Sequence, residues 1–293
     1  MHRKPRLTVA DACLILALTG GAAFVYHRIS DSLNYRWEWQ AIPQYLFRYD
    51  PASGTWVPNV LVQGFFTTIR LSIWATLFAS LIGTAMGLLR VSTSRFRRWV
   101  GFVYVELIRN TPPLVLVFIL YYFWGEQLLP GIELQAIIRR QSPGSQALLT
   151  ALLAPPGRLT AFISAVITVS IFEGAYITEI VRAGIQSIER GQGEAAAALG
   201  LTRWQCMRLV ILPQAIQRIL PPLGGQFIST IKDSSIVSVI SIQELTFRGM
   251  ELMSATYLTF ETWITITGLY FVLTFGCSLV FGRLERNRHR GRL

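Results

Sequence analysis

Six long apolar stretches dominate this chain of 293 residues and limit what it can fold into. They cover residues 9–26, 66–89, 99–124, 159–181, 214–231 and 262–282. A helix of about 20 apolar residues crosses the hydrocarbon core of a bilayer and satisfies its own backbone hydrogen bonds there. The sequence therefore predicts an all-α polytopic membrane protein with about six transmembrane helices. Pro221 and Pro222 are expected to break the fifth of them.

The composition agrees with a membrane protein. Hydrophobic residues make up 52% of the chain and charged residues only 15%, whereas a soluble domain carries about 25% charged residues. Most of the net charge of +11 lies beside the apolar stretches and in the tail 283–292. There it can meet anionic lipid headgroups, so we expect contact with membrane lipid and no nucleic acid. Cys13, Cys206 and Cys277 fall within or inside the membrane, so no structural disulfide is expected.

The distribution of Lys and Arg predicts the orientation. One set of connecting segments holds 17 of these residues and the other set holds 8. The two sets are 1–8, 90–98, 182–218 and 283–293, against 27–58, 125–158 and 232–260. Because basic residues concentrate on the cytoplasmic side, both termini are predicted to be cytoplasmic. Residues 2–26 could alternatively be a signal peptide with a poor cleavage site at residues 21–23, but an uncleaved first span is favoured.

Small residues recur every three or four positions in the second apolar stretch. Gly83 and Gly87 form a Gly-x-x-x-Gly pattern, which lets two helices approach closely in lipid. Arg70 lies near the outer end of the same stretch. Its side chain could extend outward to the interface, which is the favoured interpretation, or face a solute pathway.

A hydrophilic segment at about 188–213 separates two apolar stretches and contains Glu194-Ala195-Ala196, Gly200 and Leu212-Pro213. Residues 194–199 are strong helix formers, with the acid expected in the first turn, where the helix dipole favours it. Gly200 is expected to stop this helix in a left-handed conformation. A second helix is predicted from 202 to 212, closed by Pro213. The alanine face would let another protein approach closely, which predicts a docking helix.

This segment resembles the EAA loop of the membrane subunits of bacterial ABC importers. In that family the loop is a coupling helix that sits in a groove of a separate ATPase subunit. The resemblance implies a coupling role for Glu194, Ala195, Ala196, Gly200, Leu212 and Pro213, with Val210 where the family usually has isoleucine. The alternative is an alanine-rich surface helix that happens to precede a Leu-Pro stop.

Three further segments resemble the polar amino acid branch of the same family, the histidine, glutamate and glutamine type. They are 106–114, which holds an Arg-x-Thr-Pro motif, 174–184, and 232–235. The resemblance covers about residues 60–285 and implies a MetI-like ABC importer permease fold with a cytoplasmic coupling loop. The position of Glu173 is usually uncharged in the family, and the sequence offers no account of this residue. The external loop 125–158 matches only loosely.

The predicted organisation is an N-terminal transmembrane anchor with an external segment at 1–58, a permease domain at 59–285 and a basic cytoplasmic tail at 286–293. Polar groups near the ends of the spans are candidates for the solute pathway, because such groups are costly in a membrane and usually functional. These are Arg109, Asn110, Thr111, Glu179, Lys232, Asp233 and Ser234. Together they offer a zwitterion both an anionic and a cationic partner. Alternatively, Arg109, Glu179 and Arg182 only tie the cytoplasmic ends of helices together, which is favoured for Glu179 and Arg182.

Enzyme chemistry is not expected in this chain. The two lysines, Lys4 and Lys232, do not follow a glycine, so the phosphate-binding Gly-Lys-Ser/Thr loop is absent. All three histidines lie outside the spans, and no His-Glu-x-x-His motif occurs, so neither a metal site nor a cofactor is predicted. A secondary transporter would need ion-coupling carboxylates in the middle of spans, and we expect none.

The resemblance implies a permease subunit of an ATP-driven, binding-protein-dependent importer for a polar amino acid in the bacterial inner membrane. The implied partners are an ABC ATPase subunit that binds ATP, a second permease chain that is identical or homologous, and an extracytoplasmic solute-binding protein. A non-transporting membrane sensor or scaffold built on the same fold is the alternative. A scaffold has no need for an intact coupling loop, which favours the importer.

Overall fold

The computed structural model describes residues 9–33, 35–123, 127 and 142–290. The chain divides into two compact units, Met1–Ile42 and Pro43–Leu293. The first unit contains helix α1 (Val9–Leu33) and the short 3-10 helix η1 (Trp39–Ala41). Helix α1 is long and apolar enough to cross a membrane and coincides with the first predicted span.

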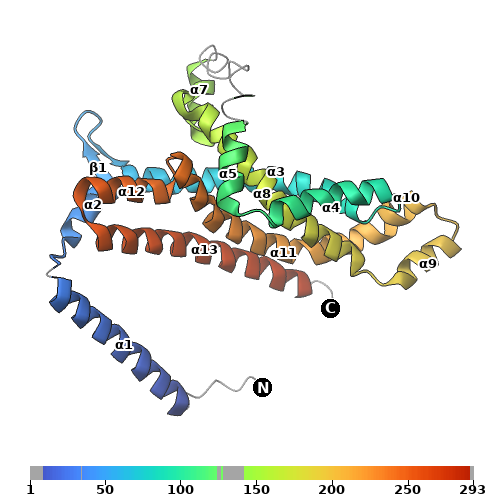
Figure 1. Cartoon of the computed structure of the whole chain (residues 1–293), viewed down its shortest axis with the longest axis horizontal. Helices are drawn as coiled ribbons and strands as arrows, with labels where there is room; N and C mark the ends of the chain where they lie inside the picture. Colours follow the sequence, from blue (N-terminus) through green and yellow to red (C-terminus); the bar gives the residue numbers. More distant parts are fainter. Residues whose placement is uncertain (1–8, 34, 124–126, 128–141, 291–293) are drawn as a thin grey trace. The chain divides into compact units, whose positions relative to one another are not determined.

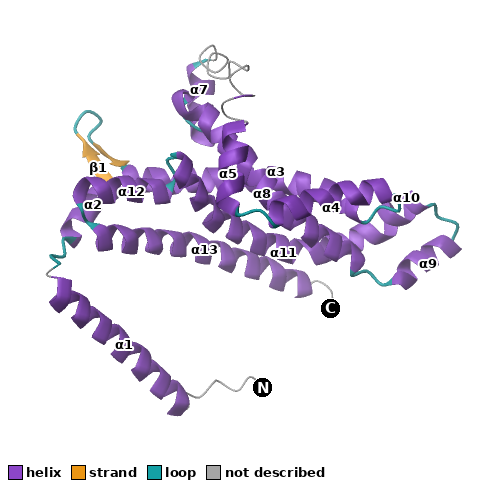
Figure 2. Cartoon of the chain, viewed as in Figure 1, coloured by secondary structure: helices purple, strands orange, loops and turns teal. Residues whose placement is uncertain are grey.

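The described residues of the second unit form helices, connecting loops and one small hairpin of strands (Figures 1 and 2). Strands β1 (Phe47–Asp50) and β2 (Thr55–Pro58) pair antiparallel, with Phe47 opposite Pro58. The helices, in chain order, are α2 (Ile42–Leu46), α3 (Val60–Arg90), α4 (Arg95–Arg109), α5 (Pro113–Tyr122), α7 (Pro143–Leu152), η3 (Pro156–Arg158), α8 (Leu159–Gln186), α9 (Arg190–Ala198), α10 (Arg203–Gln205), η4 (Cys206–Ile211), α11 (Leu212–Asp233), η5 (Ser234–Ile240), α12 (Leu245–Thr256) and α13 (Thr259–Arg290).

Helices α3 and α8 form the central pair of the second unit (Figure 1), and Gly83 and Gly87 of α3 lie at their contact. A Cβ atom placed on Gly83 would lie 2.5 Å from Cγ2 of Ile177. One placed on Gly87 would lie 2.6 Å from Cγ1 of Val181. Any side chain at these positions would push the helices apart, so the predicted packing role of the Gly-x-x-x-Gly pattern is confirmed.

Four helices among the described residues are long and apolar enough to cross a membrane: α1, α3, α8 together with the preceding turn, and α13. Helices α4 and α5 would together make a fifth span, but they meet at an angle of 110°. Residues 110–112 interrupt the helix there, because Pro112 and Pro113 cannot continue the hydrogen bonding of α4. The predicted third span at 99–124 is therefore bent at its polar interruption. The four or five candidate spans are compatible with the predicted count of about six, but α11, at the position of the predicted fifth span, is not among them.

Helix α11 corrects the expectation that Pro221 and Pro222 break the fifth span. The helix runs unbroken from Leu212 to Asp233 with both prolines inside it. Proline costs a helix its hydrogen bond and some steric strain, but its fixed φ is helical. Buried residues before and after the prolines, Ala215 and Gly224 among them, hold the helix against its neighbours across the weak point.

Candidate functional site

Helix α9 and the turn that follows it form the first half of the predicted coupling loop. The helix ends in a Schellman motif, in which the N–H of Leu201 donates to the carbonyl of Ala196 and that of Gly200 donates to Ala197. Gly200 has a φ of +79°, as the motif requires, which confirms its predicted left-handed conformation. The helix begins at Arg190, however, so the prediction that Glu194 lies in its first turn is wrong. Gly191 and Gly193 were poor signals for a helix start, because Gly weakens helix propensity without forbidding the conformation.

The second half of the loop is continuous with α11. Thr202 caps α10 in a reciprocal capping box with Gln205. A π-helical segment, η4, then joins α10 directly to α11. The expectation that Pro213 closes the second helix is wrong, because Pro213 stands in the first turn of α11. Its missing N–H costs little at that position, where the π-helical segment has already displaced the regular hydrogen bonds.

The six residues predicted for ATPase coupling do not share one surface. Ala196 is only 3% exposed, whereas Glu194, Ala195 and Gly200 are exposed on the loop. Leu212 packs against the cluster of buried residues between α8 and α11, and Pro213 is exposed beside it. The exposed tip therefore holds the residues that could meet a partner, and Leu212 anchors the loop to the bundle.

Two large apolar side chains project from the same tip. Leu199 is 82% exposed and Trp204 is 68% exposed. They flank the Schellman turn on either side of Gly200. Exposed apolar groups around a small-residue helix are the composition of a protein interface core. The sequence analysis gave Leu199 no such role, although its position directly before the glycine stop was the available signal.

The coupling loop is fastened to the bundle by polar contacts at its base. Nε2 of Gln214 on α11 donates to Oε1 of Gln192 on α9 at 3.2 Å. Arg218 on α11 donates to the carbonyl of Ser187, which caps the C-terminal end of α8. A force on α9 would therefore reach both α8 and α11.

Glu179 forms ion pairs at the end of the bundle near this loop. Its carboxylate lies 2.7 Å from Nη2 of Arg182 on the same helix and 3.4 Å from Nη2 of Arg90 at the end of α3. The sequence analysis favoured a tying role for Glu179 and Arg182, with Arg109 as a third candidate. Arg90 is the residue whose ion pair with Glu179 joins two helices. Arg109 instead places its guanidinium 5.4 Å from the ring centroid of Tyr176 on α8.

The polar groups of Asn110 and Thr111 are engaged at the end of α4. Nδ2 of Asn110 donates to Oε2 of Glu106 at 2.7 Å, and the hydroxyl of Thr111 donates to the carbonyl of Leu107 at 2.7 Å. Both contacts lie on the turn that leads into the 110° bend. They stabilise the bend, and Asn110 remains exposed.

Glu173, for which the sequence offered no account, is fully buried near the middle of α8. Its Oε2 accepts a hydrogen bond of 2.6 Å from Nε2 of Gln226 on α11. Thr230 and Asp233 of α11 also lie beside this carboxyl group. A buried carboxyl group in a membrane helix is costly unless it is hydrogen-bonded, so Gln226 and Glu173 join α8 to α11.

The predicted pathway residues are divided between two faces of α8. Arg109 contacts Tyr176, on the side that packs against α4 and α5. Asp233 lies beside Glu173, on the side that packs against α11. Lys232 and Asp233 are exposed, whereas Ser234 is buried and donates to the carbonyl of Ile231 at 2.8 Å. The structure therefore does not gather the seven residues into one site within this chain.

The contact between Glu173 and Gln226 yields a testable prediction. Gln226→Ala leaves a buried carboxyl oxygen without its donor, so the free energy of unfolding should fall by ~1–3 kcal/mol. In a Glu173→Ala background the same substitution should cost much less, because no carboxyl group remains to be left unpaired. Thermal unfolding of the four purified forms in detergent measures this double-mutant cycle. Additive losses would contradict the coupling.

No group of three or more His, Cys, Asp or Glu residues that could hold a metal ion occurs in the part of the chain that the structure describes. What remains as the candidate site is the exposed tip of the coupling loop together with the polar contacts between α8 and its neighbours.

Known proteins are similar to this chain in sequence. The chain is 35% identical over 231 residues to the glutamine transport system permease protein GlnP of Escherichia coli (strain K12), covering 78% of this chain and 92% of that protein. It is 32% identical over 257 residues to the glutamate/aspartate import permease protein GltJ of the same strain, covering 87% and 96%.

Solved structures agree. The crystal structure of an amino acid ABC transporter with histidines matches with a TM-score of 0.65 and 31% identity, over 86% of this chain and 100% of that chain. An inward-facing MetNI methionine ABC transporter, 18% identical with a TM-score of 0.59 over 78% of this chain and 95% of that chain, shows the fold alone. The predicted MetI-like permease fold is thereby confirmed. Residues 54–290 match the family model described as binding-protein-dependent transport system inner membrane component, and the chain belongs to that family.

Proposed function

We propose that this chain is the permease subunit of an ATP-driven importer for a polar amino acid, and that its coupling loop docks onto a separate ATPase subunit. Membership in the family of inner-membrane transport components supports the transport role. The relatives named for glutamine and for glutamate/aspartate support the class of solute. The observation that carries the docking assignment is the exposed tip of the loop, with Leu199 beside the Schellman turn at Gly200.

The proposed mechanism is two-state. ATP binding closes the ATPase subunits, and the coupling loop moves with them. The contacts Gln192–Gln214 and Ser187–Arg218 pass this movement to α11 and α8, so the spans tilt between inward-open and outward-open arrangements. The loop acts through shape and contact area rather than through reaction chemistry, and ATP hydrolysis belongs to the partner chain.

The proposed assembly contains two permease chains, identical or homologous, and two ATPase subunits, with an extracytoplasmic binding protein that delivers the solute. Both termini are proposed to be cytoplasmic, because 17 Lys and Arg residues lie on the side of the coupling loop against 8 on the other. This orientation places the loop where ATP is present.

Purification of the full-length tagged chain from its own host in mild detergent tests the proposal. An ATPase subunit in stoichiometric amounts is the expected companion. A chain that purifies with a kinase or a protease instead would favour a sensor or scaffold and overturn the transport assignment.

Leu199→Ser should reduce the amount of co-purified ATPase subunit by about tenfold, since an interface core residue contributes on the order of 1.4 kcal/mol or more. The chain itself should lose little stability, because Leu199 is 82% exposed. Quantitative mass spectrometry of the purified complex measures the ratio of the two chains.

Tyr257→Ser is the matched control, since Tyr257 is also 82% exposed but follows α12 at the other end of the bundle (Figure 1). It should retain the ATPase subunit in full. Equal retention by Leu199→Ser and the unsubstituted chain would contradict the docking role of the tip.

A further inference from the structure

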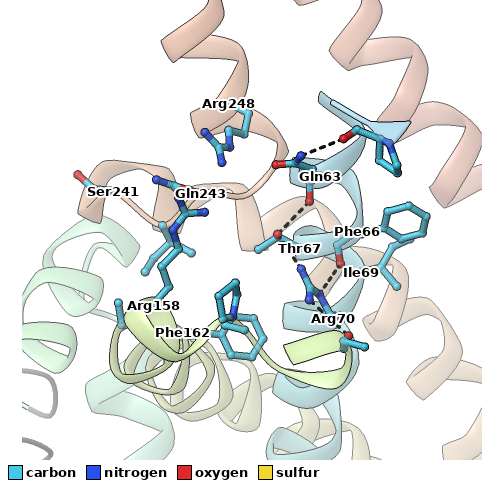
Figure 3. A pocket seen from close by; sticks show the side chains of 16 residues that line it. Gln63, Phe66, Thr67, Ile69, Arg70, Arg158, Phe162, Ser241, Gln243 and Arg248 are labelled. Atoms are coloured by element: carbon cyan, nitrogen blue, oxygen red, sulfur yellow. Dashed lines mark hydrogen bonds between the residues drawn. The ribbon is translucent and has the colours of Figure 1, made fainter. Parts of the chain in front are cut away.

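A cavity of about 510 Å³ (Figure 3) is lined by segments that lie at the end of the second unit away from the coupling loop (Figure 1). Three segments that are distant in the sequence line it: the first turns of α3, the connection from α7 to α8 with the start of α8, and the connection from η5 to α12 with the start of α12. Its volume is in the range of small-molecule sites. The cavity belongs wholly to the second unit of the chain.

Three arginines, one from each segment, line this cavity: Arg70, Arg158 and Arg248. Figure 3 shows their side chains with Gln243 around the same space. No Asp or Glu is among the lining residues. Three guanidinium groups around one cavity repel one another, and an anion in the cavity would remove this cost.

Arg248 is the most enclosed of the three. The residue is 9% exposed, and its aliphatic stem packs on Gly64, where a Cβ atom would lie 2.9 Å from Cγ of Arg248. One nitrogen, Nη1, pairs with Glu251 at 2.7 Å, but Nε is buried without a hydrogen-bond partner. Oε1 of Gln243 is also buried without a partner. A buried donor left unpaired is costly, and such a donor beside a cavity indicates a site for an acceptor.

Arg70 and Arg158 add two further positive charges to the cavity wall. Nη1 of Arg70 donates to the carbonyl of Thr150 at 2.9 Å and Nη2 donates to Oγ1 of Thr67 at 3.2 Å. These partners orient the guanidinium without neutralising it. Arg158 ends the turn before α8 and is exposed at the cavity wall.

We propose that this cavity binds the carboxylate of the transported solute at the outer end of the permease. The inference rests on the proposed import function and adds a site and a recognition chemistry to it. A carboxylate suits two guanidinium groups, because each presents paired N–H donors that match its two oxygens. Phe66 and Phe162, which also line the cavity, would contact the rest of a small amino acid.

A solute fits the cavity better than a protein side chain does. A carboxylate on a docked binding protein would have to reach Arg248, which is nine-tenths buried. A free amino acid can enter a cavity of this size whole. Phosphate is a second anion that arginines bind, so the experiment must separate carboxylate from phosphate.

Equilibrium binding of radiolabelled L-glutamate to the full-length chain in lipid nanodiscs tests the proposal. Arg158→Gln should weaken binding by about tenfold, the effect of losing one charge-assisted hydrogen bond. Arg158→Lys should recover part of the loss because it keeps the charge. Arg48→Gln on strand β1 is the matched control: it removes one exposed arginine that does not line the cavity and should change nothing.

Competition identifies the group that is recognised. Unlabelled L-glutamine should displace the probe, and L-glutaminamide, which lacks the α-carboxylate, should displace it at least tenfold less well. Displacement by inorganic phosphate as strong as by glutamine would overturn the carboxylate assignment. The site would be overturned if Arg158→Gln and Arg248→Gln both bound L-glutamate as the unsubstituted chain does. It would also be overturned if these variants lost only their binding of the solute-binding protein.

The two proposals fail in different ways. If Arg158→Gln and Arg248→Gln bind L-glutamate normally and co-purify with the ATPase subunit, the cavity site is removed and the import function stands. A chain that binds L-glutamate through Arg158 but purifies without an ATPase subunit would keep the site and remove the ATP-driven function.

Discussion

Replacing Gly200 with glutamate is expected to reduce solute uptake by about tenfold or more while the chain stays inserted in the membrane, a loss that corresponds to ~1.4 kcal/mol of coupling. Gly200 has a φ of +79°, and the N–H groups of Gly200 and Leu201 complete the Schellman motif. A residue other than Gly, Asn or Asp in this conformation costs about 1–2 kcal/mol. A Cβ atom there would meet nothing within 4 Å in this chain, so the damage is confined to the loop and whatever docks on it.

Uptake of the labelled solute and basal ATPase activity, measured together on the reconstituted complex, check this prediction. Gly200→Asn is the matched control, because Asn tolerates the left-handed conformation and should retain most of the uptake. Gly200→Ala should be intermediate, since it carries the backbone strain without the charge. Uptake at the unsubstituted rate by Gly200→Glu, at equal abundance in the membrane, would remove the coupling assignment.

Replacing Gly83 with valine should prevent the chain from reaching its native packing. A Cβ atom at this position would lie 2.5 Å from Ile177 and 3.0 Å from the backbone oxygen of Gly174. The oxygen belongs to the backbone of α8 and cannot rotate away, so the two helices must separate. Overpacking of this kind costs about 1–3 kcal/mol or more, which is a large part of the stability of a folded domain.

Thermal unfolding in detergent and the yield of monodisperse protein measure the effect. Gly276→Val is the control: Gly276 lies in α13, and a Cβ atom there would meet nothing within 4 Å. It should unfold at nearly the temperature of the unsubstituted chain. Comparable losses for the two variants would mean that β-branching in a helix, not the contact with Ile177, is responsible.

The predictable features of this chain are those that depend on local sequence. The spacing of Gly83 and Gly87 predicts close packing against another helix, although it does not identify that helix. Gly200 reports a left-handed stop because few other residues adopt that conformation. The interruption at Pro112 and Pro113 follows from the missing N–H groups. Each of these was visible in a window of a few residues.

Features that depend on tertiary packing were not predictable in this way. The sequence indicated that Pro221 and Pro222 break a helix, but buried neighbours hold α11 together. Glu173 found its hydrogen-bond donor 53 residues away on another helix. Arg90 pairs with Glu179 across two helices. Local pattern does not record such pairs, because many polar residues could serve as partners.

The arginines of the outer cavity show the same limit. Arg70 was noted near the outer end of its span, with an outward orientation favoured, yet its side chain lines a cavity and donates to the carbonyl of Thr150. Arg158 and Arg248 carried no signal of their own. Their common position around one cavity becomes visible only when the fold brings three distant segments together.

Helices α10, η4 and α11 follow one another without a break from Arg203 to Asp233, so they can transmit a displacement along their common length. This continuous helix spans about 45 Å at the usual rise per residue, from the docking tip to the neighbourhood of Glu173. No loop interrupts this helix, so a displacement of one end is transmitted to the other end through the backbone hydrogen bonds. Two of those bonds are missing at Pro221 and Pro222, and bending will concentrate there. If a partner displaces the loop as proposed, the displacement will change the angle of this helix at Pro221 and Pro222, about halfway along it.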